Sequence, residues 1–123
     1  CYSSNDTISG KSTYNGGICG FAQNGTITNC YVYANENVNG QFIGYAYSTI
    51  LTKCYYDISK STLALIKTSK SCTTNSNYIY KTNFTATSDS IPVYQLLNQW
   101  IGNNTTYLQW KADTTLPAVF ITQ

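Results

Sequence analysis

The sequence predicts an all-β fold, a short parallel β-helix (a β-solenoid with coils of about 24 residues) capped by a C-terminal helix and strand. The main observation is a repeat, because residues 16–32 recur as residues 40–56 at a constant offset of 24. Both copies are rich in Gly, Thr, Ile, Val and Tyr and lack the apolar spacing of an amphipathic helix. Asn-Gly pairs, which favour turns, also punctuate the copies.

The two copies align without gaps at glycine, apolar and cysteine positions. The matches are Gly16 with Gly40, Ile18 with Phe42, Gly20 with Gly44, Phe21 with Tyr45, Ala22 with Ala46, Ile27 with Leu51, Thr28 with Thr52, Cys30 with Cys54 and Tyr31 with Tyr55. No leucine ladder is present, so we expect coils of two or three short strands. Each strand would pair in parallel with its equivalent one turn away, at about 4.8 Å.

We expect each copy to turn a corner, at residues 28–29 and at residues 52–53. Ile27 and Leu51 are apolar at equivalent positions and are predicted to point inward. A corner after two outward residues returns the following apolar side chains to the core, namely Cys30, Val32, Cys54 and Tyr56. The strand over residues 18–22 leaves two alternatives, in which either Ile18, Gly20 and Ala22 or Cys19 and Phe21 face inward.

The signature G-G-[ILV]-x-G-[FY]…G-T-I-x-N-C-Y, from Gly16 to Tyr31, resembles the GLUG-type repeats of large extracellular bacterial proteins. These include adhesin-like regions and the non-catalytic part of IgA-protease-type peptidases. The C-terminal stretch LLNQWIGNNTTYLQWKADTTLPAVF, residues 96–120, is similar to the tail that often follows such repeats. The resemblance implies a β-helix in a surface or secreted protein, and it implies no catalytic residues.

We predict a single domain, with solenoid coils over residues 1–60 and a degenerate coil, strand and helical cap over residues 61–123. Cys1-Tyr2 repeats the Cys-Tyr pair of both copies and is interpreted as the end of a preceding unit. Its coil would be completed by a longer protein or by another molecule. Residues 61–70 are a short helix or a degenerate strand, and residues 77–85 alternate like a strand.

Ser90 to Ile101 predicts a helix. Ser90 is the expected N-cap, Pro92 suits the first turn, and Gly102 follows the end. One face is apolar and consists of Val93, Leu96, Leu97, Trp100 and Ile101. Together with Trp110 and residues 116–121, this helix is expected to cover the open end of the coils rather than to form a cofactor pocket.

The small number and the scatter of charged residues argue against nucleic-acid binding and catalysis. Only 10% of the residues are charged, the net charge is +2 and there is no His, so we expect no nucleic-acid partner. No apolar run is long enough for membrane insertion. The acidic residues are isolated in sequence, namely Asp6, Glu36, Asp57, Asp89 and Asp113. We therefore expect no enzyme, no metal site and no cofactor beyond covalent glycans; an enzyme acting on polysaccharides would depend on Asp57 or Asp113.

Five cysteines favour an oxidising compartment and at least one disulfide. Cys30 and Cys54 occupy equivalent positions, where a spacing of about 4.8 Å fits the Cα separation of a disulfide. The alternative pairs Cys1 with Cys30 and Cys54 with Cys72, and buried thiols that act as small apolar residues are a further interpretation. Cys19 is the expected free or intermolecular thiol.

Asn-x-Thr sequons predict N-glycosylation at Asn5, Asn24, Asn83, Asn103 and Asn104. The alternative is a prokaryotic chain that is simply rich in Asn and Thr. Sugars would explain how a surface with so few charges stays in solution, and glycosylation agrees with the extracellular location that the cysteines favour.

The function predicted from these features is that of an extracellular or cell-surface structural or adhesive glycoprotein without catalytic activity. Such a protein could be a subunit that binds copies of itself head-to-tail and forms a homo-oligomer or filament. The other expected partner is the remainder of a longer surface protein. The alternative is a carbohydrate-binding or adhesin module that uses exposed Tyr and Trp rings to bind glycans. Tyr2, Tyr31 and Tyr55 would form an aromatic ladder, which is more typical of packing than of ligand binding.

Overall fold

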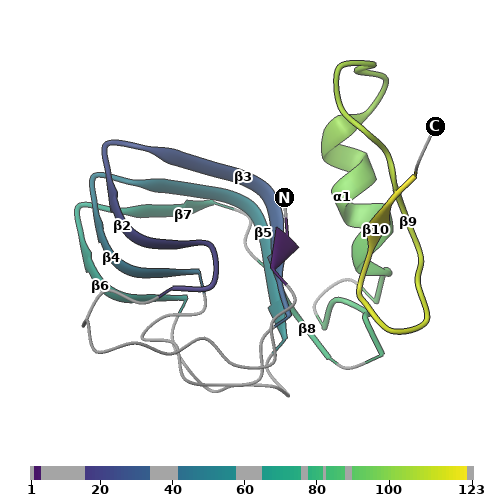
Figure 1. Cartoon of the computed structure of the whole chain (residues 1–123), viewed down its shortest axis with the longest axis horizontal. Helices are drawn as coiled ribbons and strands as arrows, with labels where there is room; N and C mark the ends of the chain where they lie inside the picture. The colour runs from purple at the N-terminus through teal and green to yellow at the C-terminus, as the bar shows by residue number, and fades with distance from the viewer. Residues whose placement is uncertain are drawn as a thin grey trace.

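The structure is a computed structural model and describes residues 2–3, 16–33, 42–57, 65–75, 78–81, 83–87 and 90–121. Each repeat contributes one strand to each of two parallel sheets (Figure 1). The three-stranded sheet has the order β2-β4-β6, with β2 at Cys19–Gln23, β4 at Ile43–Tyr47 and β6 at Ile66–Lys70. β4 lies between the equivalent strands of the repeats before and after it.

The five-stranded sheet has the order β1-β3-β5-β7, and β8 also pairs with β5. Its strands are β1 (Tyr2–Ser3), β3 (Thr26–Val32), β5 (Ile50–Asp57), β7 (Thr73–Asn75) and β8 (Tyr78–Tyr80). Cys30 pairs with Cys54 and Tyr31 with Tyr55, so the offset of 24 residues is the register of the sheet. The predicted parallel pairing of the two copies is therefore confirmed.

A third, degenerate unit follows the two copies at an offset of 23 residues. Ile43 pairs with Ile66, and Ile50 pairs with Thr73. In each of the three units a turn joins the strand of the three-stranded sheet to the strand of the five-stranded sheet, and these turns contain Asn24, Ser48 and Ser71, each with a positive φ. Of the two alternatives for residues 61–70, the strand is right from Ile66 onward, while residues 61–64 lie outside the described part. The strand predicted within residues 77–85 is also present, as β8.

The predicted corner is confirmed, because β3 and β5 bend at Asn29 and Lys53, which have φ values of 57° and 54°. Beyond the corner, alternate side chains enter two different cores. One core lies between the two parallel sheets and includes Cys30, Val32, Phe42, Ile43, Ala46, Leu51 and Cys54. Ile18, Cys19 and Ala22 pack against it whereas Phe21 is exposed, so neither alternative for this strand holds in full.

The second core joins the five-stranded sheet to the C-terminal part. Tyr31 and Tyr55 pack there with the buried face of helix α1, Val93–Ile101, that is Val93, Leu96, Leu97 and Ile101. Strands β9 (Trp110–Lys111) and β10 (Val119–Phe120) form an antiparallel pair beside the helix. Figure 1 shows α1, β9 and β10 beside β5, on the side away from β2, β4 and β6.

The prediction of a capped parallel β-helix is wrong. The described strands form two separate parallel sheets and one antiparallel pair, with one short helix, and no closed coil is found among them. The helix and the last strands do not cover the end of the stack, because they pack on the tyrosine face of β3 and β5. Of the end strands, β7 is exposed and polar, and β6 is exposed and polar apart from the half-buried Ile66.

The start of the helix also differs from the prediction. Ser90 has a positive φ and does not cap; Pro92 is the N-cap residue, and no side-chain hydrogen bond caps the helix. The N–H of Val93 instead donates to the carbonyl of Phe84 at 2.9 Å, so this donor of the first turn is satisfied without a capping side chain. The predicted end is confirmed, because the Gly102 N–H donates to the carbonyl of Asn98.

Candidate functional site

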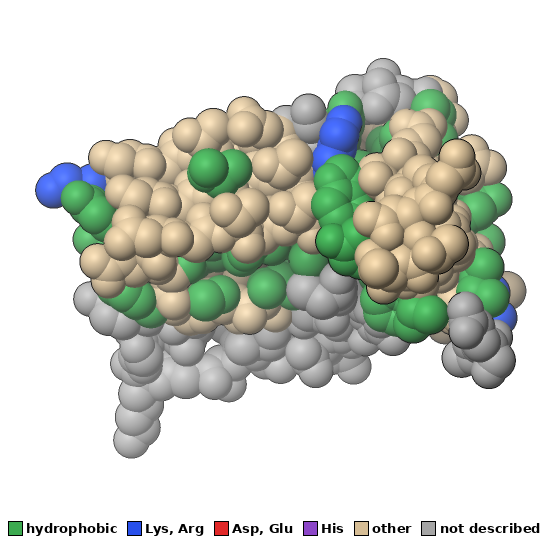
Figure 2. Space-filling view, turned by 90° about the horizontal axis from the view of Figure 1, so that it is seen from above, with side chains coloured by type: hydrophobic (Ala, Val, Ile, Leu, Met, Phe, Trp, Pro, Cys, Tyr) green, Lys and Arg blue, Asp and Glu red, His purple; other side chains and the backbone are tan. Residues whose placement is uncertain are grey.

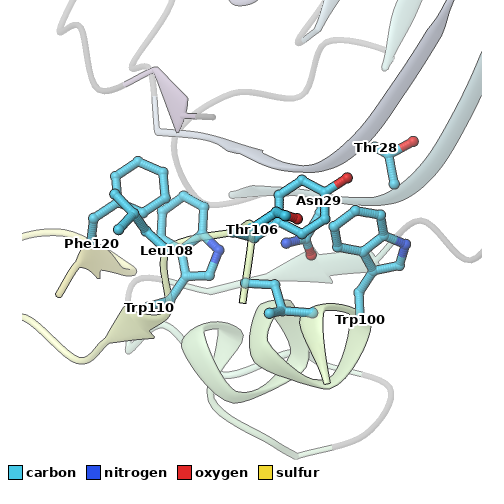
Figure 3. A pocket seen from close by; sticks show the side chains of 9 residues that line it. Thr28, Asn29, Trp100, Thr106, Leu108, Trp110 and Phe120 are labelled. Atoms are coloured by element: carbon cyan, nitrogen blue, oxygen red, sulfur yellow. The ribbon is translucent and has the colours of Figure 1, made fainter. Parts of the chain in front are cut away.

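A cleft of about 280 Å³ lies where β3, the end of α1 and the C-terminal segment meet (Figure 3). Nine residues line it: Thr28, Asn29, Trp100, Ile101, Thr106, Tyr107, Leu108, Trp110 and Phe120. None of them carries a charge. Apolar walls with a few polar groups are typical of sites for small molecules. Figure 2 shows hydrophobic side chains gathered between the strand-rich part and the C-terminal part, on a face with few charged groups.

Trp100 and Tyr107 form the open wall of the cleft. Their ring centroids lie 5.1 Å apart and the rings are tilted by 58°. Trp100 is 37% exposed and Tyr107 is 49% exposed, so a large part of each ring faces water. Leu108 beside them is also exposed. A ligand that covered these side chains would remove apolar surface from water, which favours binding.

Trp110 and Phe120 form the closed floor of the cleft. Their rings stack with centroids 4.1 Å apart, and the Trp110 ring also contacts Tyr31 at 5.7 Å. The Tyr31 hydroxyl donates a hydrogen bond of 2.5 Å to the carbonyl of Ala118. The floor is therefore held by buried groups of the core.

Asn98 anchors the loop that joins α1 to β9. Its Nδ2 donates to the carbonyl oxygen of Trp110, and its Oδ1 accepts from the Trp110 N–H, both at 2.8 Å. Within the loop, Asn104 Oδ1 accepts hydrogen bonds from the N–H and the hydroxyl of Thr106, at 2.9 and 2.5 Å. The loop that forms one side of the cleft is thus fixed at its end and in its middle.

Asn29 reaches the cleft because β3 bends at this residue. Its left-handed conformation is one that Asn tolerates better than most residues. The residue is only 5% exposed, and its Oδ1 accepts no hydrogen bond from the described residues. A buried acceptor without a partner costs about 1–3 kcal/mol, so such an atom is a candidate contact for a ligand.

The structure brings two of the four predicted disulfide residues together. Cys30 and Cys54 are register partners and lie in the structure as buried thiols, which donate to backbone carbonyls. Burial, and then the neighbouring Cys30, raises the pKa of Cys54 to about 12. Cys72 lies one residue before the Thr73–Ile50 pair, so it is not opposite Cys54. Cys1 lies outside the described residues, and the disulfide stays a prediction.

Cys19, the expected free thiol, is half-buried and donates to the carbonyl of Phe21. The three tyrosines of the predicted ladder are register partners in the backbone, although the Tyr2 side chain lies outside the described part. Tyr31 and Tyr55 are buried, and Tyr55 stacks on Tyr78 at 5.4 Å. Phe21 and Tyr45 stack at 5.3 Å with nearly parallel rings, and Phe21 remains 50% exposed.

The sequon asparagines of the described part are all on the surface. Asn24, Asn83, Asn103 and Asn104 are exposed, and Asn5 lies outside the described residues. Asn24 lies in the turn between β2 and β3, and Asn83 Oδ1 accepts from the N–H of Thr85 at 3.2 Å. An exposed sequon is accessible for modification, so glycosylation stays a prediction with suitable geometry at these sites.

The structure does not bring Asp57 and Asp113 into the cleft lining. Asp57 is buried near Tyr80, whose pKa is raised by burial and then by Asp57. Asp113 accepts hydrogen bonds from Thr115, which lower its pKa. Asp6, Glu36 and Asp89 lie outside the described residues. Within the described part, no three His, Cys, Asp or Glu side chains come together as a metal site, and no helix is long and apolar enough to cross a membrane.

Comparison of the chain with protein-family models, curated proteins and solved structures finds no match. The resemblance to GLUG-type repeats therefore stays a prediction. The cleft was not predicted from the sequence, because Trp100 was assigned to the buried apolar face of the helix. The apolar periodicity identifies that face but does not show that the core leaves Trp100 partly exposed.

Proposed function

We propose that this chain is a non-catalytic adhesive domain of an extracellular or cell-surface protein, and that it binds carbohydrate in the cleft. The observation that carries the proposal is the pair of exposed rings, Trp100 and Tyr107, beside the buried amide of Asn29. A sugar ring has an apolar face of C–H groups and a rim of hydroxyls. Aromatic rings and an amide match these two parts.

Binding without turnover is supported by the chemistry of the cleft. Its nine lining residues include no carboxylate, imidazole, thiol or amine that could transfer a proton near neutral pH. The lining can therefore hold and orient a neutral ligand. It does not supply the pair of carboxyl groups that hydrolysis of a glycosidic bond requires.

Tryptophan fluorescence tests this proposal directly, because the chain has two tryptophans and both line the cleft. Titration with soluble oligosaccharides should give a saturable change in emission. Trp100→Ala should abolish binding, whereas Tyr47→Ala should not, although Tyr47 is also 37% exposed and lies on β4 outside the cleft. If no sugar in a broad panel alters the emission, the chain is not a carbohydrate-binding domain.

The extracellular glycoprotein part of the proposal is supported by the exposed sequons at Asn24, Asn83, Asn103 and Asn104. Intact mass of native material, recorded before and after enzymatic deglycosylation, measures their occupancy. We expect a loss of hexose-containing mass. An unchanged mass would show that the sequons carry no glycan. It would not bear on carbohydrate binding in the cleft, which the fluorescence titration tests.

A fibre-forming subunit is a second candidate, favoured by the end strands of the sheets. Among the described strands, β6 and β7 pair on one side only and are exposed, so they could continue the stack in a second copy. Lys67 and Lys70 on β6 oppose this, because edge lysines discourage strand addition. Electron microscopy of native material should show filaments if this candidate is right, and monodisperse particles would reject it.

A further inference from the structure

We infer that the ligand of the cleft is a single neutral glycan chain of at least two sugar units, which continues from the cleft over Tyr107 and Leu108 into a second hollow. This inference rests on the proposed carbohydrate-binding function and names the class of glycan. The class is an oligosaccharide chain in solution, rather than one terminal sugar or the flat surface of a crystalline polysaccharide.

The second hollow adjoins the cleft. It has a volume of about 380 Å³ and shares Tyr107 and Leu108 with the cleft. The cleft alone, at about 280 Å³, falls below the range of about 300–1,000 Å³ that is usual for ligand sites, whereas the two hollows together fall within it. The rest of the second lining comes from the loop after α1 and from the residue after β10: Gly102, Asn103, Asn104, Thr105, Gln109 and Ile121.

Exposed apolar side chains concentrate around these two hollows. Of the seven large apolar side chains that are exposed in the described part of the chain, four line one hollow or both, namely Trp100, Tyr107, Leu108 and Ile121. Exposed apolar groups that cluster mark binding surfaces, whereas isolated ones need no explanation. A ligand confined to the cleft would leave Ile121, which lines only the second hollow, uncovered.

The two linings complement different parts of a sugar chain. The cleft is walled mainly by aromatic and aliphatic side chains, which suit the C–H faces of a sugar ring. The second hollow adds the side-chain amides of Asn103, Asn104 and Gln109 and the hydroxyl of Thr105. Amides and hydroxyls both donate and accept hydrogen bonds, as sugar hydroxyls do. Neither lining contains a charged residue, so the carboxylates of a polyuronic acid would lose hydration without gaining an ion pair.

Hydrogen bonds hold the walls of the second hollow in place. In the loop after α1, the N–H of Asn104 donates to the carbonyl of Ile101 at 3.1 Å, and Asn104 Oδ1 accepts from the N–H of Thr106. Next to β9 and β10, the N–H of Ile121 donates to the carbonyl of Gln109 at 2.9 Å, which extends the pairing of these strands by one step. Walls that are ordered before binding reduce the entropy cost when the ligand arrives.

The angle between Trp100 and Tyr107 argues against a flat ligand. Their rings are tilted by 58° with centroids 5.1 Å apart, so the two ring faces do not lie in one plane. The chains at the surface of a crystalline polysaccharide do lie in one plane and would stack on only one of these rings. A single chain in solution rotates about its glycosidic bonds and can contact both rings in turn.

The length of the sugar chain tests the inference. Cello-, malto- and manno-oligosaccharides of one to five units are titrated by tryptophan fluorescence. In the series that binds best, affinity should increase about tenfold from one unit to three and change little for longer chains, because both hollows are then filled. Oligogalacturonate of the same lengths should bind more weakly than this series. Microcrystalline cellulose should not retain the protein in a sedimentation assay.

Gln109→Ala and Ile121→Ala each remove a side chain that lines the second hollow only. Both variants should bind the three-unit ligand several-fold more weakly and should bind one unit as the natural chain does, which also shows that they are folded. Gln23→Ala, at an exposed position of β2 outside both hollows, is the matched control and should change neither affinity. The protein is expressed without N-glycans, because a glycan on Asn103 or Asn104 would compete for the second hollow.

Equal affinities for one, three and five units would overturn the inference and leave the proposed function standing. Retention by microcrystalline cellulose, a preference for oligogalacturonate, or unchanged three-unit affinity in both variants would do the same. Absence of a response to all of these ligands and to the broad sugar panel would overturn the proposed function as well.

Discussion

Asn98 and Trp110 are joined by two hydrogen bonds, each 2.8 Å long, between the side-chain amide of Asn98 and the backbone N–H and carbonyl of Trp110. The Asn98 amide acts as a neighbouring strand would, because it satisfies both the N–H and the carbonyl of Trp110. This relationship joins the helix to the first residue of β9. It fixes the loop between them, which forms one side of the cleft.

Replacement of Asn98 should therefore impair both stability and binding. Asn98→Ala leaves the two backbone groups of Trp110 without their partners, and we expect the free energy of unfolding to fall by about 1–3 kcal/mol. Sugar affinity should fall as well, because the loop loses its anchor. Urea unfolding and the fluorescence titration measure the two effects. Gln99→Ala, at an exposed position of the same helix, is the matched control.

Gly16 should not tolerate a side chain, because backbone atoms of its own repeat and of the next repeat approach it closely. A Cβ there would clash with the carbonyl oxygen of Cys19 and would lie 2.6 Å from that of Phe42 and 2.8 Å from the nitrogen of Gly44. Gly16→Ala should lower the free energy of unfolding by about 1–3 kcal/mol. Gly25→Ala meets no atom within 4 Å and should change stability by less than about 1 kcal/mol. Equal effects in thermal or urea unfolding would contradict the close approach.

Alkaline pH should destabilise the reduced protein. The pKa of Cys54 rises from 9.0 to about 12 on folding, and burial also raises the pKa of Tyr80 above its ordinary 10.0. Above pH 9.0 the unfolded chain therefore binds fewer protons than the folded chain, so the free energy of unfolding falls as pH increases. Urea unfolding below and above this pH measures the slope. Tyr80→Phe should make the slope shallower, and a stability that increased with pH would refute the prediction.

Thiol labelling should separate the four described cysteines into two classes. In reduced, folded protein, iodoacetamide should modify the half-buried Cys19 and Cys72 before the buried Cys30 and Cys54. The reaction needs an accessible thiolate, and burial disfavours both access and ionisation. Peptide mass spectrometry measures the order, and the difference should disappear in urea. Equal rates in the folded protein would show that the inner core opens readily.

The repeat could be predicted because it is recorded in the sequence at a fixed offset. Cys30 and Cys54, matched in the repeat, are register partners, and the corner predicted at residues 28–29 is the bend at Asn29, although Asn29 itself is buried rather than outward-facing. The third unit was only partly foreseen, since its offset is 23 residues and polar Thr73 replaces apolar Ile50 at the equivalent position. Local patterns alone did not decide how these strands would be grouped into sheets.

The cleft could not be predicted in the same way. Asn29 and Trp100 are far apart in sequence, and no local pattern indicates that a bend in one strand will meet the end of a helix. The apolar face of the helix was read correctly at Val93, Leu97 and Ile101. Its position on the tyrosines of β3 and β5, rather than over the end strands, depends on tertiary packing.

The hydrogen bond from Tyr31 to Ala118 spans 87 positions of the chain. Its consequence concerns biosynthesis. A ribosome makes about 5–20 residues per second, and N-terminal parts can begin to fold while the rest is still being made. The two full repeats can thus pair while the chain is still emerging, but the floor of the cleft needs Trp110 and Phe120. The nascent protein acquires paired strands first, and its capacity to hold a ligand is among the last properties to mature.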